Sequence, residues 1–459
     1  MIMRCHFFIN ILLYLLLQIF RCSKSAAITE NIPDKCEDLG VFRYLIFDAG
    51  SSKTRLYMYS FQKDKIGMIV LKKYEEVGKM TALSELGSKA SHTTLKKEMN
   101  ALLNQAKDVL ENYCLEKVYV YLRATAGLRA LPIQTANEIL VVVREVFSKS
   151  LYKYVGDNSA QIMSGIDEGF WLWVFMNFAK QTFTTCGISN KITSFDLGGG
   201  STQMTTLTSN IKVTPEMTEN IIREKINDCE YEVYSVSYEG FGAQATRMKY
   251  FADGSTSVCI ADGLKVTFKF GDTDTQYTGV KIADEKRYNT CKYQAQFIVK
   301  DILKVWDASS KPTQLELVSA FYYIPKTAHA VKNNCKSYSE NNCDLGDSYV
   351  MNIIKLKELA KYFCENPVSN PETIKNFEYS EYLCIDLIYV ITLLNDGYGL
   401  EDKEIQFRMI NQIDQLKVGW PMGFAYGLCV NYSFTIYNNS IYFMLLIPIF
   451  KTIIFEIFS

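Results

Sequence analysis

The two most informative deficits of this sequence are its scarcity of histidine and its lack of the cysteine spacing that binds zinc. Only three histidines occur among 459 residues. No pair of cysteines has the CxxC spacing that is typical of zinc sites. A metal centre built on imidazole or thiolate is therefore disfavoured, and a metal in this protein would be a hard cation held by oxygen atoms.

An excess of either charge is also lacking. The chain carries 49 basic and 50 acidic residues, for a formal net charge of -1. No overall field would attract nucleic acid or an anionic membrane, so we expect no nucleic-acid partner. A phosphate-bearing ligand would have to be held by local geometry instead. The hydrophobic fraction of 48% and the charged fraction of 22% are typical of a globular protein.

No low-complexity block or long Pro/Gly linker divides the body, but both ends of the chain are apolar. The run Phe7–Phe20 follows a basic residue and precedes small residues, which is typical of a signal peptide or N-terminal membrane anchor over 1–27. The run is short for a bilayer span, which needs about 20 residues. The C-terminal tail, 436–459, is apolar apart from Lys451 and Glu456. It fits a short membrane anchor and an apolar surface helix equally well.

The cysteines and two glycosylation acceptors indicate the lumen of the secretory pathway. Acceptor triplets begin at Asn431 and Asn438, just before the apolar tail. Thirteen cysteines are present, and in an oxidising compartment they would form disulfides, whereas in a cytosolic enzyme they would be small buried residues. Short spacings predict the pairs Cys259–Cys291, Cys335–Cys343 and Cys364–Cys384.

Two segments of the body resemble each other. In each, a short apolar run ends in an aspartate, Asp48 or Asp196. Glycine and hydroxyl residues follow, and then a second alternating run begins. This pattern predicts a strand, a tight glycine turn and an antiparallel return strand. We therefore expect two related lobes, each with its turn open to a shared cleft.

Strands alternate with helices between and after these hairpins, which predicts an α/β fold. A strand is expected over Tyr119–Arg123, with helices over Thr135–Lys149 and from Asp167 through Phe178. The later half is less regular. It contains strand-like pieces at Lys265–Phe270 and Gln276–Ile282 and a helical pattern over Ile353–Phe363.

The two glycine turns are suited to binding phosphate. Glycine lets backbone N–H groups converge on an anion, and hydroxyl groups add donors without bulk. The aspartates would repel phosphate directly, so a hydrated Mg²⁺ or Ca²⁺ held by Asp48 and Asp196 through waters is expected between them. One such turn often has only a structural role, but two copies in one chain are much more specific evidence for a phosphate-binding site. The turn residues are Gly50, Ser51 and Ser52 in the first hairpin and Gly198, Gly199, Gly200 and Ser201 in the second.

Hydrolysis also needs a base, and two adjacent acids begin a predicted helix. Ser164 lies three residues before Asp167, the spacing of a helix cap, so Asp167 is assigned to the cap and the helix dipole. Glu168 is left as the better candidate base. The alternative, that both acids only start the helix, is equally compatible with the local sequence.

These motifs together resemble the apyrase family of ecto-nucleoside triphosphate diphosphohydrolases, over the span from Tyr44 to Leu428. The stretch Tyr238–Tyr250 is most similar to the intracellular, Golgi and lysosomal branch. The matching blocks occur in the family's order: Asp48–Ser52, Ala124–Arg129, Ser164–Gly169, Asp196–Gln203 and Gly419–Ala425.

The resemblance implies an actin-like fold of two ribonuclease-H-like lobes with nucleotide and divalent cation between them. Lobe I would span 37–160, lobe II 161–404, and a return segment 405–435 would pack on lobe I. The implied activity removes terminal phosphates from nucleoside di- and triphosphates, and the implied location is membrane-associated in the Golgi or another endomembrane, or at the cell surface.

The resemblance also implies roles for single residues. Glu168 would be the catalytic base, with Thr125, Ser201 and Gln203 around the attacking water, and Arg129 would help to bind phosphate. Tyrosines would sandwich the nucleobase, and the candidates are Tyr322, Tyr323 and Tyr398.

Three departures from the family pattern stand beside these expectations. Lys53 follows the first turn where a small residue or histidine is usual. The helix after Glu168 reads Trp171-Leu-Trp173 where a small residue or glycine commonly precedes the tryptophan, and Pro421-Met422 interrupts the last block. The alternatives are an exopolyphosphatase of the same fold, a nucleotide-binding module without turnover as in actin or heat-shock chaperones, and an interaction protein with a vestigial site.

Overall fold

The computed structural model describes residues 40–87, 91–110, 113–187, 191–251, 254–270, 273–302, 314–340, 342–400 and 405–430. All of these except residues 113 and 114 belong to one compact unit. The predicted leader 1–27, the tail 436–459 and the acceptors Asn431 and Asn438 lie outside the described residues. Within the described part of the chain, no helix combines the length and apolar character needed to cross a bilayer.

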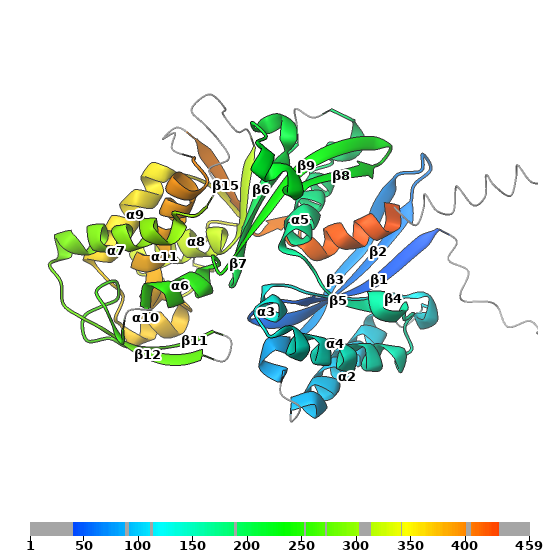
Figure 1. Ribbon diagram of the computed structural model, residues 1–459, viewed down its shortest axis with the longest axis horizontal. Coiled ribbons are helices and arrows are strands. Elements are labelled where there is room, and N and C mark those ends of the chain that lie inside the picture. The colour runs from blue at the N-terminus through cyan, green and yellow to red at the C-terminus, as the bar shows by residue number, and fades with distance from the viewer. Residues whose placement is uncertain are drawn as a thin grey trace, which may run out of the picture. The chain divides into compact units, whose positions relative to one another are not determined.

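The first predicted hairpin forms the centre of a five-stranded sheet. In the order of the sheet, the first three strands pair antiparallel, and the last two strands run parallel to the third. Helices α2 (His92–Val109) and α4 (Ile133–Ser148) lie together on one face (Figure 1). The strand order is β3 (Ile69–Thr81), β2 (Lys53–Lys63), β1 (Val41–Ala49), β4 (Tyr119–Ala124) and β5 (Ala160–Ile162).

The second hairpin forms the centre of a seven-stranded sheet whose inner five strands repeat the first sheet. Strands β9, β7, β6, β13 and β15 have the same order and the same relative directions as β3, β2, β1, β4 and β5. The predicted duplication is thereby confirmed, and β1 corresponds to β6. The full order is β14 (Ser348–Asn352), β15 (Gln406–Ile410), β13 (Leu315–Ser319), β6 (Thr193–Leu197), β7 (Ser201–Leu207), β9 (Cys229–Glu239) and β8 (Ile221–Ile226).

A group of helices covers one face of the second sheet (Figure 1). Every residue of α11 (Leu383–Thr392) is buried, as expected for a helix that is apolar on all sides. Around it lie α7 (Asp284–Val299), α8 (Ala320–Lys332) and α9 (Ile353–Glu365). The remaining elements are short: α3 (Ala126–Arg129), α6 (Ala243–Phe251), α10 (Pro371–Asn376), β10 (Thr256–Ser257), β11 (Lys265–Phe270), β12 (Thr273–Gly279), β16 (Gln412–Ile413) and β17 (Leu416–Lys417).

Helix α5 (Gly165–Ala179) packs against a final helix, described from residue 420 to 430. A Cβ atom at Gly423 would lie 1.8 Å from the Trp171 carbonyl oxygen, and one at Gly427 would lie 2.3 Å from the Trp171 ring. Only glycine permits this approach. The large residue at 171, a departure from the family pattern, is thus accommodated by two glycines of the last helix.

The predicted elements occur, with shifts at their ends. Helix α5 begins two residues before Asp167, and β12 starts and ends three residues before the predicted Gln276–Ile282 strand. Such shifts arise because apolar periodicity locates the middle of an element better than its ends. The predicted boundary at 160/161 falls within β5, and the lobe limits stay predictions, because both sheets belong to one compact unit.

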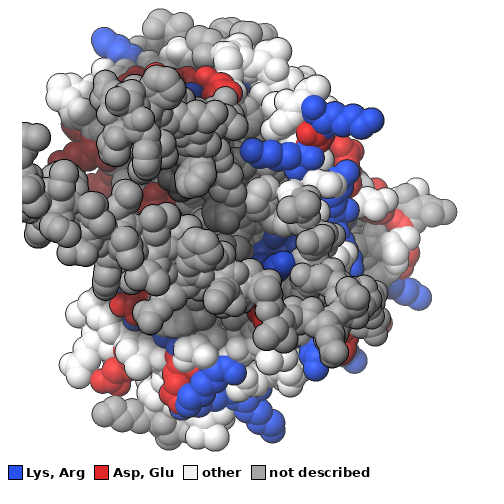
Figure 2. Space-filling view, turned by 90° about the vertical axis from the view of Figure 1, so that its right-hand side faces the viewer, with Lys and Arg blue, Asp and Glu red and all other residues white. Residues whose placement is uncertain are grey.

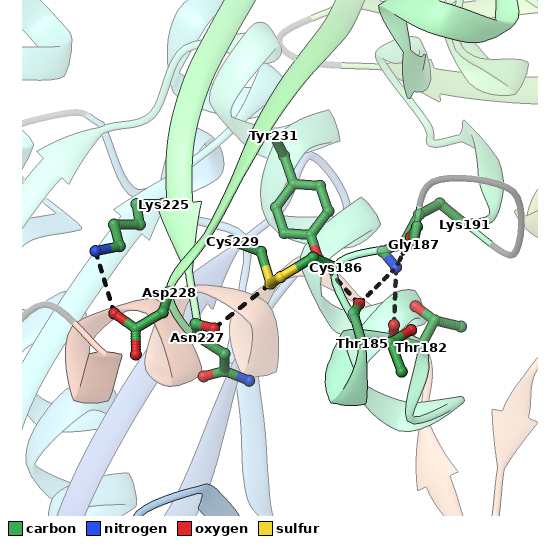
Figure 3. Close-up of a disulfide and its surroundings, with 10 residues drawn as sticks. All are labelled: Thr182, Thr185, Cys186, Gly187, Lys191, Lys225, Asn227, Asp228, Cys229 and Tyr231. Atoms are coloured by element: carbon green, nitrogen blue, oxygen red, sulfur yellow. Dashed lines mark hydrogen bonds and ion pairs between the residues drawn. A yellow bond between two sulfur atoms is a disulfide. The ribbon is translucent and has the colours of Figure 1, made fainter.

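All three predicted disulfides are present, and a fourth was not predicted. Cys186 is bonded to Cys229, which ties the loop after α5 to the start of β9 (Figure 3). In the same loop, the Lys191 amine donates hydrogen bonds to the carbonyls of Thr182 and Gly187, at 2.8 and 2.6 Å. A sequence separation of 43 residues gave no local signal for this pair.

Replacing both Cys186 and Cys229 with alanine should destabilise the fold. Closing a loop of 43 residues stabilises a protein by about 4 kcal/mol in the chain-entropy model. Denaturant titration of the oxidised protein measures this loss. Cys429→Ala is the control, because Cys429 is a buried free thiol. If the double variant is no less stable than the control, the loop is held without the disulfide.

Candidate active site

The two glycine turns approach each other closely. A Cβ atom at Gly199 would lie 2.6 Å from the Ser51 hydroxyl oxygen, and one at Gly127 would lie 3.0 Å from the Ser51 Cα. Side chains at these glycines would therefore force the turns apart. The predicted phosphate-binding residues of both hairpins are brought to one place, and Lys53 is exposed at the start of β2.

Backbone carbonyl oxygens of the second turn accept hydrogen bonds from N–H groups of helix α6. Gly198 accepts from the Ala243 N–H at 2.8 Å, and Gly199 accepts from the N–H groups of Gln244 and Ala245 at 3.0 Å each. A planar trans peptide directs its N–H opposite to its C=O. The N–H groups of Gly199 and Gly200 therefore point away from α6, which is the arrangement that an anion-binding turn requires.

Asp48 and Asp196 occupy equivalent positions near the ends of β1 and β6. Asp48 pairs with Arg55 across its hairpin and accepts a hydrogen bond from Trp420 of the last helix. Burial raises the pKa of Asp48 to about 6, which Arg55 opposes and the charge of Asp196 reinforces. Each of the two aspartates thus increases the cost of ionising the other.

Asp196 is held by a strained residue. The Ser319 hydroxyl donates a hydrogen bond that lowers the pKa of Asp196, although burial raises it overall. Ser319 has a φ of 59° and a ψ of -125°, a backbone conformation that residues with a side chain rarely adopt. The other oxygen, Oδ1 of Asp196, is buried and has no hydrogen-bond partner among the described residues.

Glu168 lies in the first turn of α5, close to both aspartates. Its Oε2 accepts from Arg129 Nη2 at 2.9 Å and from Gln203 Nε2 at 3.4 Å. Burial raises the pKa of Glu168 to about 8; Arg129 opposes this rise, and the charges of Asp196 and Asp48 add to it. A carboxylate with a pKa near neutrality is suited to accept a proton.

Asp167 has the structural role that its spacing predicts. Its N–H donates to the Ser164 hydroxyl oxygen at 3.0 Å, and its Oδ2 accepts from the same hydroxyl at 2.7 Å. The side chain therefore caps α5 and is not directed at Glu168. The cap role of Asp167 is confirmed, and the role of Glu168 as the base stays a prediction.

Two of the three residues predicted around the attacking water, Ser201 and Gln203, are connected to each other and to Glu168. Gln203 Nε2 donates to Ser201 Oγ at 2.8 Å, and Arg129 Nη2 lies 3.3 Å from the same oxygen. Thr125 is placed beside the first turn, where its N–H donates to the Ala49 carbonyl at 3.1 Å. Arg129, which was expected to bind phosphate, donates a hydrogen bond to the carboxylate of Glu168, the candidate base.

The three predicted nucleobase-binding tyrosines differ in exposure. Tyr398 is fully buried and shares a hydrogen bond of 3.1 Å with Thr202, and Tyr322 is 1% exposed. Both tyrosines are therefore core residues, with their rings buried and their hydroxyl groups hydrogen-bonded within the protein. Tyr323 is 47% exposed and its hydroxyl donates to Asn411 Oδ1 at 2.6 Å. Among the three, Tyr323 alone presents a ring for stacking.

The residues present fit a hard divalent cation. The carboxyl groups of Asp48, Asp196, Glu168 and Glu239 outnumber the two guanidinium groups of Arg55 and Arg129 at the site. The unpartnered Asp196 Oδ1 is an oxygen donor of the kind that Mg²⁺ and Ca²⁺ prefer. Among the described residues, the candidate group of clustered ligand atoms is Cys335, Glu340 and Cys343, and its cysteines form a disulfide. That Asp48 and Asp196 hold a cation through waters stays a prediction.

Charges on the described surface are mixed. Figure 2 shows side chains of Lys and Arg beside those of Asp and Glu on the same face. This distribution agrees with the balanced composition of the chain.

Two convergent glycine turns, a pair of carboxylates suited to a cation and a glutamate with a raised pKa are the groups that a phosphohydrolase would use. A model of the GDA1/CD39 (nucleoside phosphatase) family matches residues 41–439, and the chain belongs to this family. The predicted class of enzyme, which hydrolyses phosphate from nucleoside di- and triphosphates, is confirmed.

Similar proteins span nearly the same length. Ectonucleoside triphosphate diphosphohydrolase 5 of Ailuropoda melanoleuca is 29% identical over 407 residues, covering 84% of this chain and 87% of the relative. A nucleoside diphosphate phosphatase of Homo sapiens is 28% identical, covering 84% and 86%. A nucleoside-triphosphatase of Pisum sativum is 27% identical, covering 83% and 86%.

The fold has a counterpart among solved structures. A nucleoside triphosphate hydrolase from Neospora caninum superposes with a TM-score of 0.60 at 12% sequence identity, covering 86% of this chain and 93% of that one. The similarity shows the fold and agrees with the predicted duplication.

Three residues at the site were not predicted. Ser319 and Trp420 donate to the two aspartates, and Glu239 contacts Arg129 at 2.8 Å. Trp420 lies in a block that the resemblance had named, so that block was the available signal. Glu239 lies in the stretch Tyr238–Tyr250, which the resemblance had also named, and Ser319 directly precedes the helix of Tyr322 and Tyr323, but neither residue had been assigned a role.

Replacing Asp48 with asparagine should stabilise the metal-free protein at neutral pH. A carboxyl group whose folded pKa is raised from 3.8 to about 6 costs stability as the pH rises through this interval. The variant should therefore exceed the wild type by up to about 3 kcal/mol near pH 7.5, and by nothing near pH 3. Denaturant titrations in EDTA at both pH values measure the difference.

Asp157→Asn is the matched control, because the Asp157 side chain is 85% exposed and should give no pH-dependent difference. A less stable Asp48→Asn variant near pH 7.5 would mean that Arg55 and Trp420 more than offset the cost of burying the charge.

Proposed function

We propose that the protein removes the terminal phosphate of nucleoside di- and triphosphates by attack of a water that Glu168 deprotonates. The observation that carries this proposal is the position of Glu168, whose carboxylate contacts Arg129 and Gln203 beside both glycine turns. The printed names of the relatives, which include a nucleoside diphosphate phosphatase and a nucleoside-triphosphatase, support the substrate class.

Each residue of the site has a role in this reaction. N–H groups of the two glycine turns, those of Gly199 and Gly200 among them, would hold the phosphate oxygens. Ser51 and Ser201 would add hydroxyl donors. A divalent cation bound through waters at Asp48 and Asp196 would neutralise charge on the phosphoryl oxygens.

The attacking water would lie between Ser201, Gln203 and Glu168. Gln203 donates to Ser201 at 2.8 Å, which fixes both side chains relative to the base. Arg129 holds Glu168 Oε2 at 2.9 Å and keeps the other oxygen of the carboxylate available to accept the proton. Thr125 supports the first turn through Ala49.

We assign nucleobase stacking to Tyr323, since its ring is 47% exposed. The location that fits this chemistry is the lumen of the secretory pathway, because disulfides persist in oxidising compartments. The leader 1–27, the tail 436–459 and glycosylation at Asn431 and Asn438 belong to this proposal.

Glu168→Gln should lower kcat by roughly 10²–10⁴, because glutamine keeps the size and hydrogen bonding but cannot take the proton. Nucleotide binding should survive. Asp167→Asn is the matched control, and should cost about 1 kcal/mol of stability through the helix cap and little activity. Phosphate release from UDP, GDP and ATP, with polyphosphate as a comparison substrate, measures the effect. Near-normal turnover by Glu168→Gln would end this assignment.

Removal of divalent cations should abolish turnover. EDTA should inactivate the enzyme, and Mg²⁺ or Ca²⁺ should restore activity, since neither Asp48 nor Asp196 can face a phosphate without a cation between them. Asp196→Asn should weaken reactivation and raise the metal concentration needed for half-maximal activity. Full phosphate release in EDTA would contradict the role of both aspartates.

A further inference from the structure

Arg129 is shared between two glutamates. Its Nη2 lies 2.9 Å from Glu168 Oε2 and 2.8 Å from Glu239 Oε1, while Nη1 donates to the Met163 carbonyl at 2.9 Å. An Nη atom carries two hydrogens. The two carboxylates therefore occupy both donors of Nη2, and the Ser201 oxygen at 3.3 Å is the weakest of its three contacts.

Glu239 is also connected to the other partner of the base. It is the last residue of β9 and pairs with Ser201 of the second turn. Its Oε1 accepts from Ser237 Oγ at 3.1 Å, and Ser237 accepts from Gln203 Nε2 at 3.0 Å. Of the two side chains that contact Glu168, Arg129 is thus bonded to Glu239 directly and Gln203 is linked to it through Ser237.

Helix α5 fits against this network only because residue 165 is glycine. A Cβ atom at Gly165 would lie 2.8 Å from Glu239 Oε1 and 2.2 Å from Ser237 Oγ. The N-terminus of the helix that carries Glu168 is therefore packed directly on Glu239 and Ser237. The side chain of Arg129 is only 13% exposed, so its ion pairs are screened less than those of a surface arginine.

We propose that Glu239 is a positioning residue for the reaction, which holds Arg129 in the orientation that directs Glu168 to the attacking water. This inference rests on the proposed function of Glu168. Glu239 also shares the positive charge of Arg129, so that this charge does not act on Glu168 alone. The other charged groups that face Glu168 are Asp48 on β1 and Asp196 on β6, and both favour its protonated form.

Glu239→Gln and Glu239→Ala test the proposal, with Glu232→Gln as the matched control. Glu232 lies on the same strand, is 44% exposed against 47% for Glu239, and also pairs with an arginine, Arg223. Kinetics with UDP at saturating Mg²⁺ give kcat and KM separately. We expect kcat to fall by about 10-fold in Glu239→Gln and by about 10² in Glu239→Ala, with KM changed less than about 3-fold and the control unaffected.

The pH profile distinguishes positioning from a loss of fold. In Glu239→Gln the charge of Arg129 acts on Glu168 alone, so the acidic limb of kcat/KM should move to lower pH. A purely structural effect would lower activity without moving this limb. Thermal unfolding should show melting temperatures close to that of the wild type for both glutamine variants.

A double-mutant cycle separates this proposal from the assignment of the base. In a Glu168→Gln background, Glu239→Gln should have no further effect on kcat, because Glu239 acts through Glu168. Unchanged kcat in Glu239→Ala, or fully additive losses in the double variant, would overturn the positioning role. Near-normal turnover by Glu168→Gln together with an inactive Glu239→Gln would instead make Glu239 the base, and would overturn both the positioning role and the assignment of Glu168.

Discussion

Electrostatic repulsion among buried carboxylates is the constraint on which the rest of this site depends. Asp48, Asp196 and Glu168 each raise the cost of ionising a neighbour, and burial adds to that cost. A site of this kind persists only if the surrounding structure holds it in place and supplies compensating donors. The donors come from separate elements: Arg55 from the first hairpin, Arg129 from α3, Ser319 from the end of β13 and Trp420 from the last helix.

The duplicated sheets explain how two such aspartates come together. Because β1 and β6 occupy the same place in the same strand order, each brings its aspartate and its glycine turn to an equivalent position. Gly199 then allows the second turn to approach Ser51 of the first. The same symmetry places Arg55 opposite one aspartate and Gln203 opposite the other. One half of the repeat therefore supplies charge compensation, and the other supplies a hydrogen-bond donor to the base.

Features encoded within a short stretch were predictable from the sequence, and those that depend on distant partners were not. Both hairpins, the cap formed by Ser164 and Asp167, and the three closely spaced disulfides follow from local spacing. The Cys186–Cys229 bond and the Ser319 contact arise only when strands far apart in sequence become neighbours. Burial of Tyr398 was missed for the same reason. Its motif names an aromatic residue, but the packing of Phe195 and Tyr238 around it is a property of the folded chain.

The close fit of the last helix on Trp171 has a consequence for biosynthesis. The chain emerges from the ribosome with its N-terminal end first, and the first sheet, both glycine turns and Glu168 all precede residue 420. Asp48, near the beginning, receives the Trp420 hydrogen bond only after nearly the whole described chain has been made. The order of synthesis therefore delays the Trp420 hydrogen bond to Asp48 until residue 420 has left the ribosome, long after the first sheet has been made.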